Sequence, residues 1–392
     1  MTNIPMSSPE LNDADIKAVN DVLKTRYLSL GPKSKAFERQ FASYIGTDHA
    51  AGVNSGTSGL HLAIIAAGIG DGDLVITTPF SFIASSNSIL FERAIPIFVD
   101  IDPKTYNIDP DQVAQAAYDL VQGGETAKKW LPPSFRTPNS AIRNLKAILP
   151  VDAFAQPADY DPLHAVAEEH DLIIIEDSCE AIGAEYKGRN AGTLGDVAVF
   201  AFYPNKQMTT GEGGMIVTNN AEWDALFRSL RNQGRDVFDA WLNHTRLGYN
   251  YRMDEMSAAL GISQLNRIES LLAKREQVAD WYNERLAEVV GIETPYIAST
   301  TTRMSWFVYV VRITSSVGRD RVMTILKEHD IPSRPYFTPI HLQPFYMDKF
   351  GYNRGDFPVT EEAGDTCLAL PFSGVMTEEQ VDIVCNTLKA AL

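Results

Sequence analysis

Residues 197–217 combine two apolar runs with a short polar segment that contains a single lysine. The first run, residues 197–202, is rich in β-branched and aromatic side chains, which is typical of a strand buried on both faces. Two threonines and three glycines separate Lys206 from the second apolar run. Because glycine permits positive φ values and close backbone approach, the sequence predicts that Lys206 lies in a sharply turned loop between two buried strands.

The placement of Lys206 makes it a candidate nucleophile. A lysine amine held against apolar walls loses part of its hydration. Such an amine forms Schiff bases with carbonyl groups, including that of pyridoxal phosphate. The alternative is a surface lysine on a glycine-containing hairpin, and the loop alone does not distinguish the two.

Short apolar runs alternate with helical segments along the first part of the chain. The strand candidates are residues 50–53, 74–77, 95–99, 147–151 and 172–175, and the helix candidates include 34–45 and 161–170. Such alternation predicts βαβ units and a mostly parallel central sheet, so the fold class is α/β. The polar segment from about 110 to 145 reads as loop.

The final third of the chain has a different pattern. A long helical pattern runs from about 254 to 290, and a strand candidate at 306–311, a helix near 319–329 and a loop at 333–341 follow it. This order is typical of an α+β domain. We therefore expect an N-terminal arm over residues 1–30, a large domain over 31–253 and a smaller C-terminal domain over 254–392.

Composition narrows the classes of function. A formal net charge of −16 argues against binding to nucleic acid or to anionic membranes, so any anionic substrate needs local donors. Cys179, Cys367 and Cys385 fit no metal-ligand spacing, which indicates a reduced protein without a metal site. No apolar run is long enough to span a membrane, and residues 1–8 lack the pattern of a signal peptide, so we expect a cytoplasmic protein.

Small hydroxyl-bearing residues precede a buried helical run at residues 60–67. Gly56, Thr57 and Ser58 lie at this junction. Free backbone N–H groups at the start of a helix, with hydroxyls beside them, are suited to bind phosphate. Serine and threonine are also ordinary N-caps, so the motif alone is not specific. His61, in the same run, is interpreted as a packed or capping residue.

Two other strand ends carry candidate site residues. Phe82 follows the strand at 74–77 and could cover the face of a bound ring, or could pack in the core. Asp177 and Glu180 follow the strand at 172–175, at the edge of the sheet where α/β proteins bind ligands. A carboxylate there could hold a pyridine nitrogen protonated, which makes pyridoxal phosphate an electron sink, or could cap the next helix.

Taken together, these motifs identify a family. The matching segments are 28–32 (LSLGP), 54–57 (NSGT), 79–82 (PFSF), 98–100 (FVD), 176–177 (ED), 192–196 (GTLGD), 209–214 (TTGEGG) and 248–252 (GYNYR). Along nearly its whole length the chain resembles the DegT/DnrJ/EryC1/StrS sugar aminotransferases. The resemblance implies fold type I of the pyridoxal phosphate enzymes and a homodimer with shared active sites.

The resemblance also implies roles for individual residues. Lys206 stands at the position of the Schiff-base lysine, and Asp177 at that of the acid that pairs with the pyridine nitrogen. Glu180 stands where a side chain hydrogen-bonds the phenolic oxygen of the cofactor. Phe82 matches the aromatic residue that stacks on the ring, and Gly56, Thr57 and Ser58 match the phosphate cradle. Asn250 matches an asparagine that the neighbouring subunit donates to the phosphate.

Two positions depart from the family pattern. Ala201 stands where a serine often binds the phosphate, which leaves the cradle one hydroxyl short. Asp152 replaces a histidine that is common after the Pro-Val of its strand. The lysine is retained, which speaks against the dehydratase branch of the family, where a histidine takes its place.

The expected reaction is transfer of an amino group from an amino acid, with L-glutamate as the expected donor, to a nucleotide-linked keto-sugar. Glu180 and the loop with Arg334 and His341 resemble the branch that acts at C4 of 4-keto-6-deoxyhexoses, which includes GDP-perosamine synthases. Such products serve polysaccharide or glycoside biosynthesis. A packed interdomain loop is the alternative for Arg334 and His341.

Other functions stay open at this stage. A 3-keto sugar or a keto-cyclitol could be the acceptor, because the cofactor motifs do not read the substrate. A catalytically silent sensor or regulator on the same fold is a further alternative, against which the retained Lys206 and Asp177 weigh. A dinucleotide-binding dehydrogenase is excluded because no G-x-G-x-x-G follows the first strand.

Overall fold

The structure is a computed structural model that describes residues 3–136, 144–236 and 243–392. A seven-stranded sheet forms its centre. In spatial order the strands are β1 (His49–Val53), β9 (Gly214–Thr218), β8 (Val197–Ala201), β5 (Ile173–Asp177), β4 (Leu145–Leu149), β2 (Leu74–Thr77) and β3 (Ile95–Phe98). β9 pairs antiparallel with both of its neighbours, and the other pairs are parallel. The predicted mostly parallel α/β sheet is confirmed.

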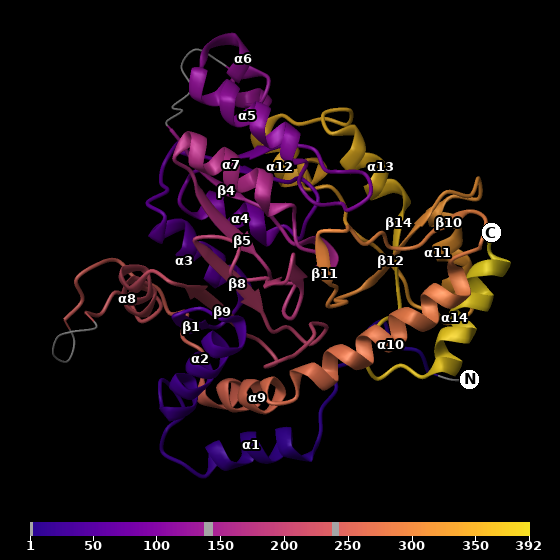
Figure 1. The fold of residues 1–392 in the computed structure, drawn as a ribbon, viewed down its shortest axis with the longest axis horizontal. Helices are drawn as coiled ribbons and strands as arrows, with labels where there is room; N and C mark the ends of the chain where they lie inside the picture. Colours follow the sequence, from indigo (N-terminus) through magenta and orange to yellow (C-terminus); the bar gives the residue numbers. More distant parts are fainter. Residues whose placement is uncertain (1–2, 137–143, 237–242) are drawn as a thin grey trace.

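Helices cover both faces of this sheet (Figure 1). One face packs against α3 (Gly56–Ala66), α4 (Ala84–Phe91) and α8 (Ala221–Leu230). The other face packs against α5 (Pro110–Gln122), α7 (Tyr160–His170), α2 (Pro32–Ile45) and α9 (Glu255–Leu265). Strand alternation explains this double burial, because Val199 of β8 enters the first core and Phe200 enters the second.

The loop predicted for residues 110–145 is wrong for the described part of that segment up to residue 136, which is largely helical. It contains α5, α6 (Gly124–Lys128) and a short 3₁₀ helix at Pro133–Phe135, and residues 137–143 lie outside the described residues. Asp109 caps α5 by accepting hydrogen bonds from the N–H groups of Asp111 and Gln112. Pro110 then opens the helix and Val113 is buried, so the local signals for a helix were present in a polar context.

The C-terminal part has its own core. Its four-stranded antiparallel sheet has the order β10 (Ile292–Glu293), β12 (Tyr309–Ile313), β14 (Cys367–Leu370) and β13 (Arg334–Pro335). Around it lie α10 (Ile268–Leu286), α11 (Arg319–Glu328), α13 (Pro358–Thr366) and α14 (Glu378–Ala390). Tyr282 and Leu286 of α10 pack in this core, and so does Ile4 from the other end of the chain.

The helical pattern at 254–290 forms two helices rather than one. α9 ends at Leu265 and α10 begins at Ile268, although neither Asn266 nor Arg267 between them is a glycine or a proline. α9 packs against α1 (Asp13–Leu23) and α2. α10 then runs from the large sheet region towards α14, as Figure 1 shows. One long helix therefore links the two cores.

The remaining elements are short. They are β6 (Glu185–Tyr186), β7 (Arg189–Asn190) and β11 (Thr301–Arg303) in a three-stranded sheet, α12 (Pro344–Phe350), and 3₁₀ helices at Ala153–Ala155 and Ile340–Leu342. In α12, Tyr346 and Phe350 pack in the core of the large sheet. Between β13 and β14 of the small sheet, the chain therefore returns to the core of the large sheet.

Candidate active site

The loop between β8 and β9 carries Lys206, as predicted. The backbone N–H of Lys206 donates to the carbonyl of Tyr203 at 2.9 Å, which closes a tight turn. The Lys206 side chain is only 12% exposed. Its Nζ lies 3.3 Å from Oε1 of Glu180 and 3.8 Å from the centre of the Phe307 ring. The amine is thus held between one carboxyl group and one aromatic wall.

Glu180 is buried on the side of the Lys206 amine that does not face Phe307. Its Oε2 accepts a hydrogen bond from the backbone N–H of Phe154 at 3.1 Å, while Oε1 faces Lys206. Burial raises the pKa of the Glu180 carboxyl above its usual range, and the charge of Lys206 opposes that rise. Glu180 and Lys206 therefore form a pair in which a proton can be exchanged at short range.

Asp177 is the last residue of β5 and is also buried. Its Oδ2 accepts a hydrogen bond from the hydroxyl of Ser85 at 2.7 Å, and its Oδ1 accepts one from the N–H of Cys179 at 3.2 Å. These donors fix the carboxylate at the carboxyl end of the sheet. An anchored carboxylate in that place is suited to pair with a protonated ring nitrogen.

The N-terminus of α3 closes the other end of the site. Ser55 caps the helix by accepting from the N–H of Ser58 at 3.1 Å. The N–H groups of Gly56 and Thr57 lie in the first turn, where a helix has no acceptor of its own for them. A Cβ at position 56 would lie 2.8 Å from Cβ of Ala201, so the glycine is required by close packing. This end presents N–H donors and a helix dipole, which favour a phosphate.

A single cavity of about 490 Å³ joins these groups. Its lining includes Gly56, Thr57, Phe82, Ser85, Asp177, Cys179, Glu180, Ala201, Tyr203, Lys206, Glu212, Phe307, Tyr336 and Phe337. The donors for phosphate, the buried carboxylate, the amine and the aromatic walls thus face one space. Pyridoxal phosphate needs each of these groups, and the residues present fit it.

Phe82 lies at this cavity and is 64% exposed, so its ring is not part of the core. Ser58, by contrast, does not line the cavity, because its hydroxyl donates to Oδ1 of Asn54 at 2.6 Å. Its contribution to the cradle is through the cap of α3. Asn250 is exposed and lies near the start of α3, where its carbonyl accepts from Asn54 at 3.4 Å. It does not line the cavity of its own chain.

The structure does not bring Arg334 and His341 to the cavity. Arg334 is exposed, and its guanidinium donates to the carbonyl of Ser333 at 2.9 Å. His341 is fully buried, pairs with Oε1 of Glu361 at 3.0 Å and packs edge-on against Phe357. Burial lowers the pKa of His341, so the ring is a neutral packed residue at pH 7. The expected substrate contact of His341 is therefore wrong, and the alternative of a packed loop is correct for this residue.

The aromatic residues of the same loop take that place instead. Tyr336 and Phe337 line the cavity together with Phe307. Sequence reasoning singled out the charged residues of this loop and missed its apolar ones. Ser85, which fixes Asp177, was missed as well, although it lies only three residues after Phe82.

Comparison with known proteins identifies the family. Residues 9–389 match the DegT/DnrJ/EryC1/StrS aminotransferase family. The chain belongs to this family. It is similar to the GDP-perosamine synthase of Caulobacter vibrioides, with 37% identity over 100% of this chain and 99% of that protein.

Two solved structures of the same type are similar over nearly the whole chain. DesV of S. venezuelae has a TM-score of 0.84 and 33% identity, covering 96% of this chain and 93% of DesV. Spr1654 of Streptococcus pneumoniae, solved in a PLP form, has a TM-score of 0.88 and 26% identity, covering 100% of this chain and 98% of that one. The predicted enzyme class, a sugar aminotransferase that uses pyridoxal phosphate, is confirmed.

Among the residues that the structure describes, no group of three or more His, Cys, Asp or Glu side chains could hold a metal ion. None of the helices in residues 3–136, 144–236 and 243–392 is long and apolar enough to cross a membrane.

Proposed function

We propose that this aminotransferase moves an amino group from L-glutamate to a nucleotide-linked keto-sugar, specifically an NDP-4-keto-6-deoxyhexose. The products are 2-oxoglutarate and an amino sugar, so the amino and keto groups change places between the two substrates. The full-length 37% identity to a GDP-perosamine synthase carries this proposal. A 3-keto sugar or a keto-cyclitol is the competing acceptor, because the residues that would hold the cofactor are the same for each.

The residues of the cavity would divide the work of cofactor binding. Asp177 would hold the ring nitrogen, Thr57 and the first turn of α3 would hold the phosphate, and Phe82 would cover the ring. Lys206 would anchor the aldehyde carbon. When bound, pyridoxal phosphate withdraws electrons from the α-carbon of the amino donor, which makes the α-proton removable.

Proton transfer would fall to the Lys206–Glu180 pair. The amine at Nζ of Lys206 would take the α-proton of the donor and return it at the cofactor, and the second half of the reaction would reverse these transfers. Glu180 lies 3.3 Å from Nζ, and burial raises the pKa of its carboxyl above the usual range, so it would hold a proton more readily than an exposed glutamate and could exchange it with the amine. Phe307 would keep water away from the amine on the other side.

The charge of the cavity supports a homodimer with shared sites. Among the described residues that line it, Lys206 is the only one with a basic side chain, yet a dicarboxylate donor and a nucleotide diphosphate are both anions. A second copy would supply the missing donors, and Asn250 would be one of them. The arm and α1 also expose several large apolar side chains, which a second copy could cover: Leu11, Ile16, Leu23, Tyr27, Leu28 and Leu30.

A substrate screen tests the reaction. The protein would be converted to its amino-cofactor form with L-glutamate and then mixed with each candidate keto-sugar nucleotide while the visible absorbance is recorded. Return of the original spectrum with a 4-keto-6-deoxyhexose nucleotide, and not with a 3-keto sugar or keto-cyclitol, is the expected result. Reconversion by only one of the competing acceptors would contradict the proposal. Lys206→Ala is the negative control.

A mixed-dimer experiment tests the shared site. Lys206→Ala and Asn250→Ala are each expected to be impaired, but a heterodimer of the two has one site with both native residues. Co-expressed chains carrying different tags allow the heterodimer to be purified. Recovery of part of the activity is expected. A purified heterodimer that recovers none would show that Lys206 and Asn250 do not meet across the interface.

A further inference from the structure

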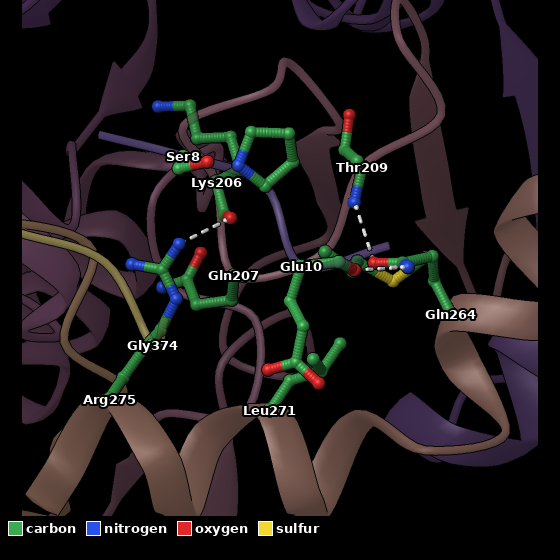
Figure 2. A pocket seen from close by; sticks show the side chains of 11 residues that line it. Ser8, Glu10, Lys206, Gln207, Thr209, Gln264, Leu271, Arg275 and Gly374 are labelled. Atoms are coloured by element: carbon green, nitrogen blue, oxygen red, sulfur yellow. Dashed lines mark hydrogen bonds between the residues drawn. The ribbon is translucent and has the colours of Figure 1, made fainter. Parts of the chain in front are cut away.

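Behind the Lys206 loop lie residues of the arm, of α10 and of the turn at Gly374, all distant from it in sequence. Figure 2 shows a small pocket bounded by Ser8 and Glu10 of the arm, by Gln207 and by Arg275 of α10. Its volume is about 10 Å³, enough for one water molecule. The carbonyl of Lys206 faces Arg275 there, while the Lys206 amine extends away from it. The loop that carries the amine is therefore held from behind.

Arg275 makes an unusual set of contacts. Nη2 donates to the carbonyls of Lys206 at 2.7 Å and Asn205 at 3.2 Å. Nη1 donates to the carbonyls of Phe307 at 3.1 Å and Trp306 at 3.2 Å. The residue is only 3% exposed, and no described carboxylate lies within ion-pair distance of it. One guanidinium thus bonds four backbone oxygens from two separate segments.

A buried cation without a carboxylate is costly. Burial lowers the pKa of the Arg275 guanidinium to about 10, with no opposing charge. Arg231 shows the usual arrangement, because it is similarly buried but pairs with Glu38. The four carbonyl bonds hold Arg275 in place, but an apolar side chain would avoid the desolvation altogether. The contacts of this residue therefore indicate a role other than stability.

Arg275 joins the loop that carries the Lys206 amine to the segment that forms the aromatic wall beside that amine. Asn205 and Lys206 belong to the loop after β8, and Phe307 provides the aromatic wall 3.8 Å from Nζ. A second link lies beside the first, since Nε2 of Gln207 donates to the hydroxyl of Ser305 at 2.9 Å. These hydrogen bonds tie the loop to the wall on the side away from the amine.

We propose that Arg275 is a positioning residue that sets the Lys206 amine between Phe307 and Glu180. This inference rests on the proposed role of Lys206 as the residue that anchors the cofactor. Without the guanidinium, the loop and the wall separate and water reaches Nζ. A displacement of about 1 Å at a reacting group can lower the rate on the order of 100-fold. Water that reaches this site would also lower the pKa of the Glu180 carboxyl, which burial now raises, and so shift the pH dependence of capture.

The experiment compares three variants. Arg275→Met removes the donors, and Arg275→Lys keeps a charge but cannot reach both pairs of carbonyls. Arg285→Lys is the matched control, because Arg285 lies on the same helix and bonds the side chains of Glu378 and Asp382 on α14. Circular dichroism checks that each variant is folded.

The readout is capture of pyridoxal phosphate by the cofactor-free protein. The bound cofactor is fixed by borohydride at a series of pH values, and peptide mapping locates the label. For Arg275→Met we expect capture at Lys206 slowed at least tenfold and a shifted pH midpoint, with Arg275→Lys intermediate and Arg285→Lys like the wild type. If Arg275→Met does not fold, Arg275→Lys carries the test.

The outcomes separate two failures. A wild-type protein labelled at a lysine other than Lys206 would overturn the proposed site itself. Wild-type labelling at Lys206, with the same rate and pH midpoint in the folded Arg275 variants, would overturn the role of Arg275 alone. Loss of rate without a change in the pH midpoint would also overturn it, because a merely structural defect lowers the rate at every pH.

Discussion

Asp152, one of the two departures from the family pattern, predicts an unusual response of stability to pH. Its side chain is fully buried next to that of Glu176, and the hydroxyl of Ser178 lies between them, 2.7 Å from Asp152 and 2.6 Å from Glu176. A hydroxyl has one proton and cannot donate to both. Burial raises the pKa of both carboxyls, but Glu176 also accepts from the N–H groups of Leu194 and Gly195, which opposes the rise there. We therefore expect Asp152 to hold the proton and to donate it to Ser178.

An asparagine at position 152 reproduces this pattern without a titrating proton. Its carbonyl would accept from the N–H of Ala158 and the hydroxyl of Tyr160, as Oδ1 of Asp152 does now at 3.0 Å in each case. Its amide would donate to Ser178. Asp152→Asn thus keeps the hydrogen bonds of the buried site and removes only the ionisation.

The magnitude follows from the direction of the pKa shift. Burial and the charge of Glu176 raise the pKa of Asp152 well above the value of about 3.9 in an unfolded chain. Between these two pKa values the folded state keeps the proton and the unfolded state releases it. This one group then lowers the free energy of unfolding of the wild type by about 1.4 kcal/mol for each unit by which pH rises. Asp152→Asn lacks this loss, so its advantage grows with pH until the folded pKa is passed.

Urea unfolding of the wild type and the variant at matched protein concentration, at pH values from 5 to 8, measures the effect. The control is Asp161→Asn, because Asp161 is exposed and the neighbouring Lys187 lowers its pKa instead. That control should show no advantage that grows with pH. Parallel stability curves for wild type and Asp152→Asn would refute the protonated Asp152.

Three further predictions concern the cofactor cavity. Gly56→Ala should weaken pyridoxal phosphate binding in a spectroscopic titration, because the added Cβ would lie 2.8 Å from Cβ of Ala201 and from Sγ of Cys179. Gly70→Ala is the control, because the space around Gly70 is open. Ala201→Ser should tighten binding about tenfold, since one more hydrogen bond to a charged group contributes about 1.5 kcal/mol; unchanged binding would place the phosphate elsewhere. Glu180→Gln should remove one pH-dependent transition from the visible spectrum of the loaded protein, and an unchanged titration would contradict the role of Glu180.

The parts of the site that sequence could predict are those with a local signal. Lys206 follows a buried strand and precedes a glycine-rich turn, and Asp177 ends a strand of five residues, so period and turn chemistry locate both. The first turn of α3 was predicted for the same reason. These positions reach one cavity because the carboxyl ends of parallel strands share an edge.

The parts that sequence could not predict depend on tertiary packing. In the loop from 333 to 341, packing against the core behind the loop decides which side chains enter the cavity. Phe337 lines the cavity, whereas Arg334 and His341, which the sequence favoured for their charge, do not. Arg275 carried no signal, because a single arginine in a long polar helix is ordinary. Its four carbonyl partners come from segments about 30 and 70 residues away.

The net charge of the chain leads to a last prediction, on salt dependence. The cavity presents the carboxyl groups of Asp177, Glu180 and Glu212, and the whole chain has a net charge of −16. An anionic nucleotide-sugar therefore meets long-range repulsion, which salt screens over about 10 Å at 0.1 M. As salt rises from a low level to about 0.1 M, we expect kcat/KM for that substrate to increase, the reverse of an electrostatically steered enzyme. Higher salt should lower it again by weakening the local contacts to the phosphates. A neutral osmolyte at matched osmolarity is the control. A steady fall from the lowest salt would mean that cations near the site dominate the approach and that the net charge does not govern it.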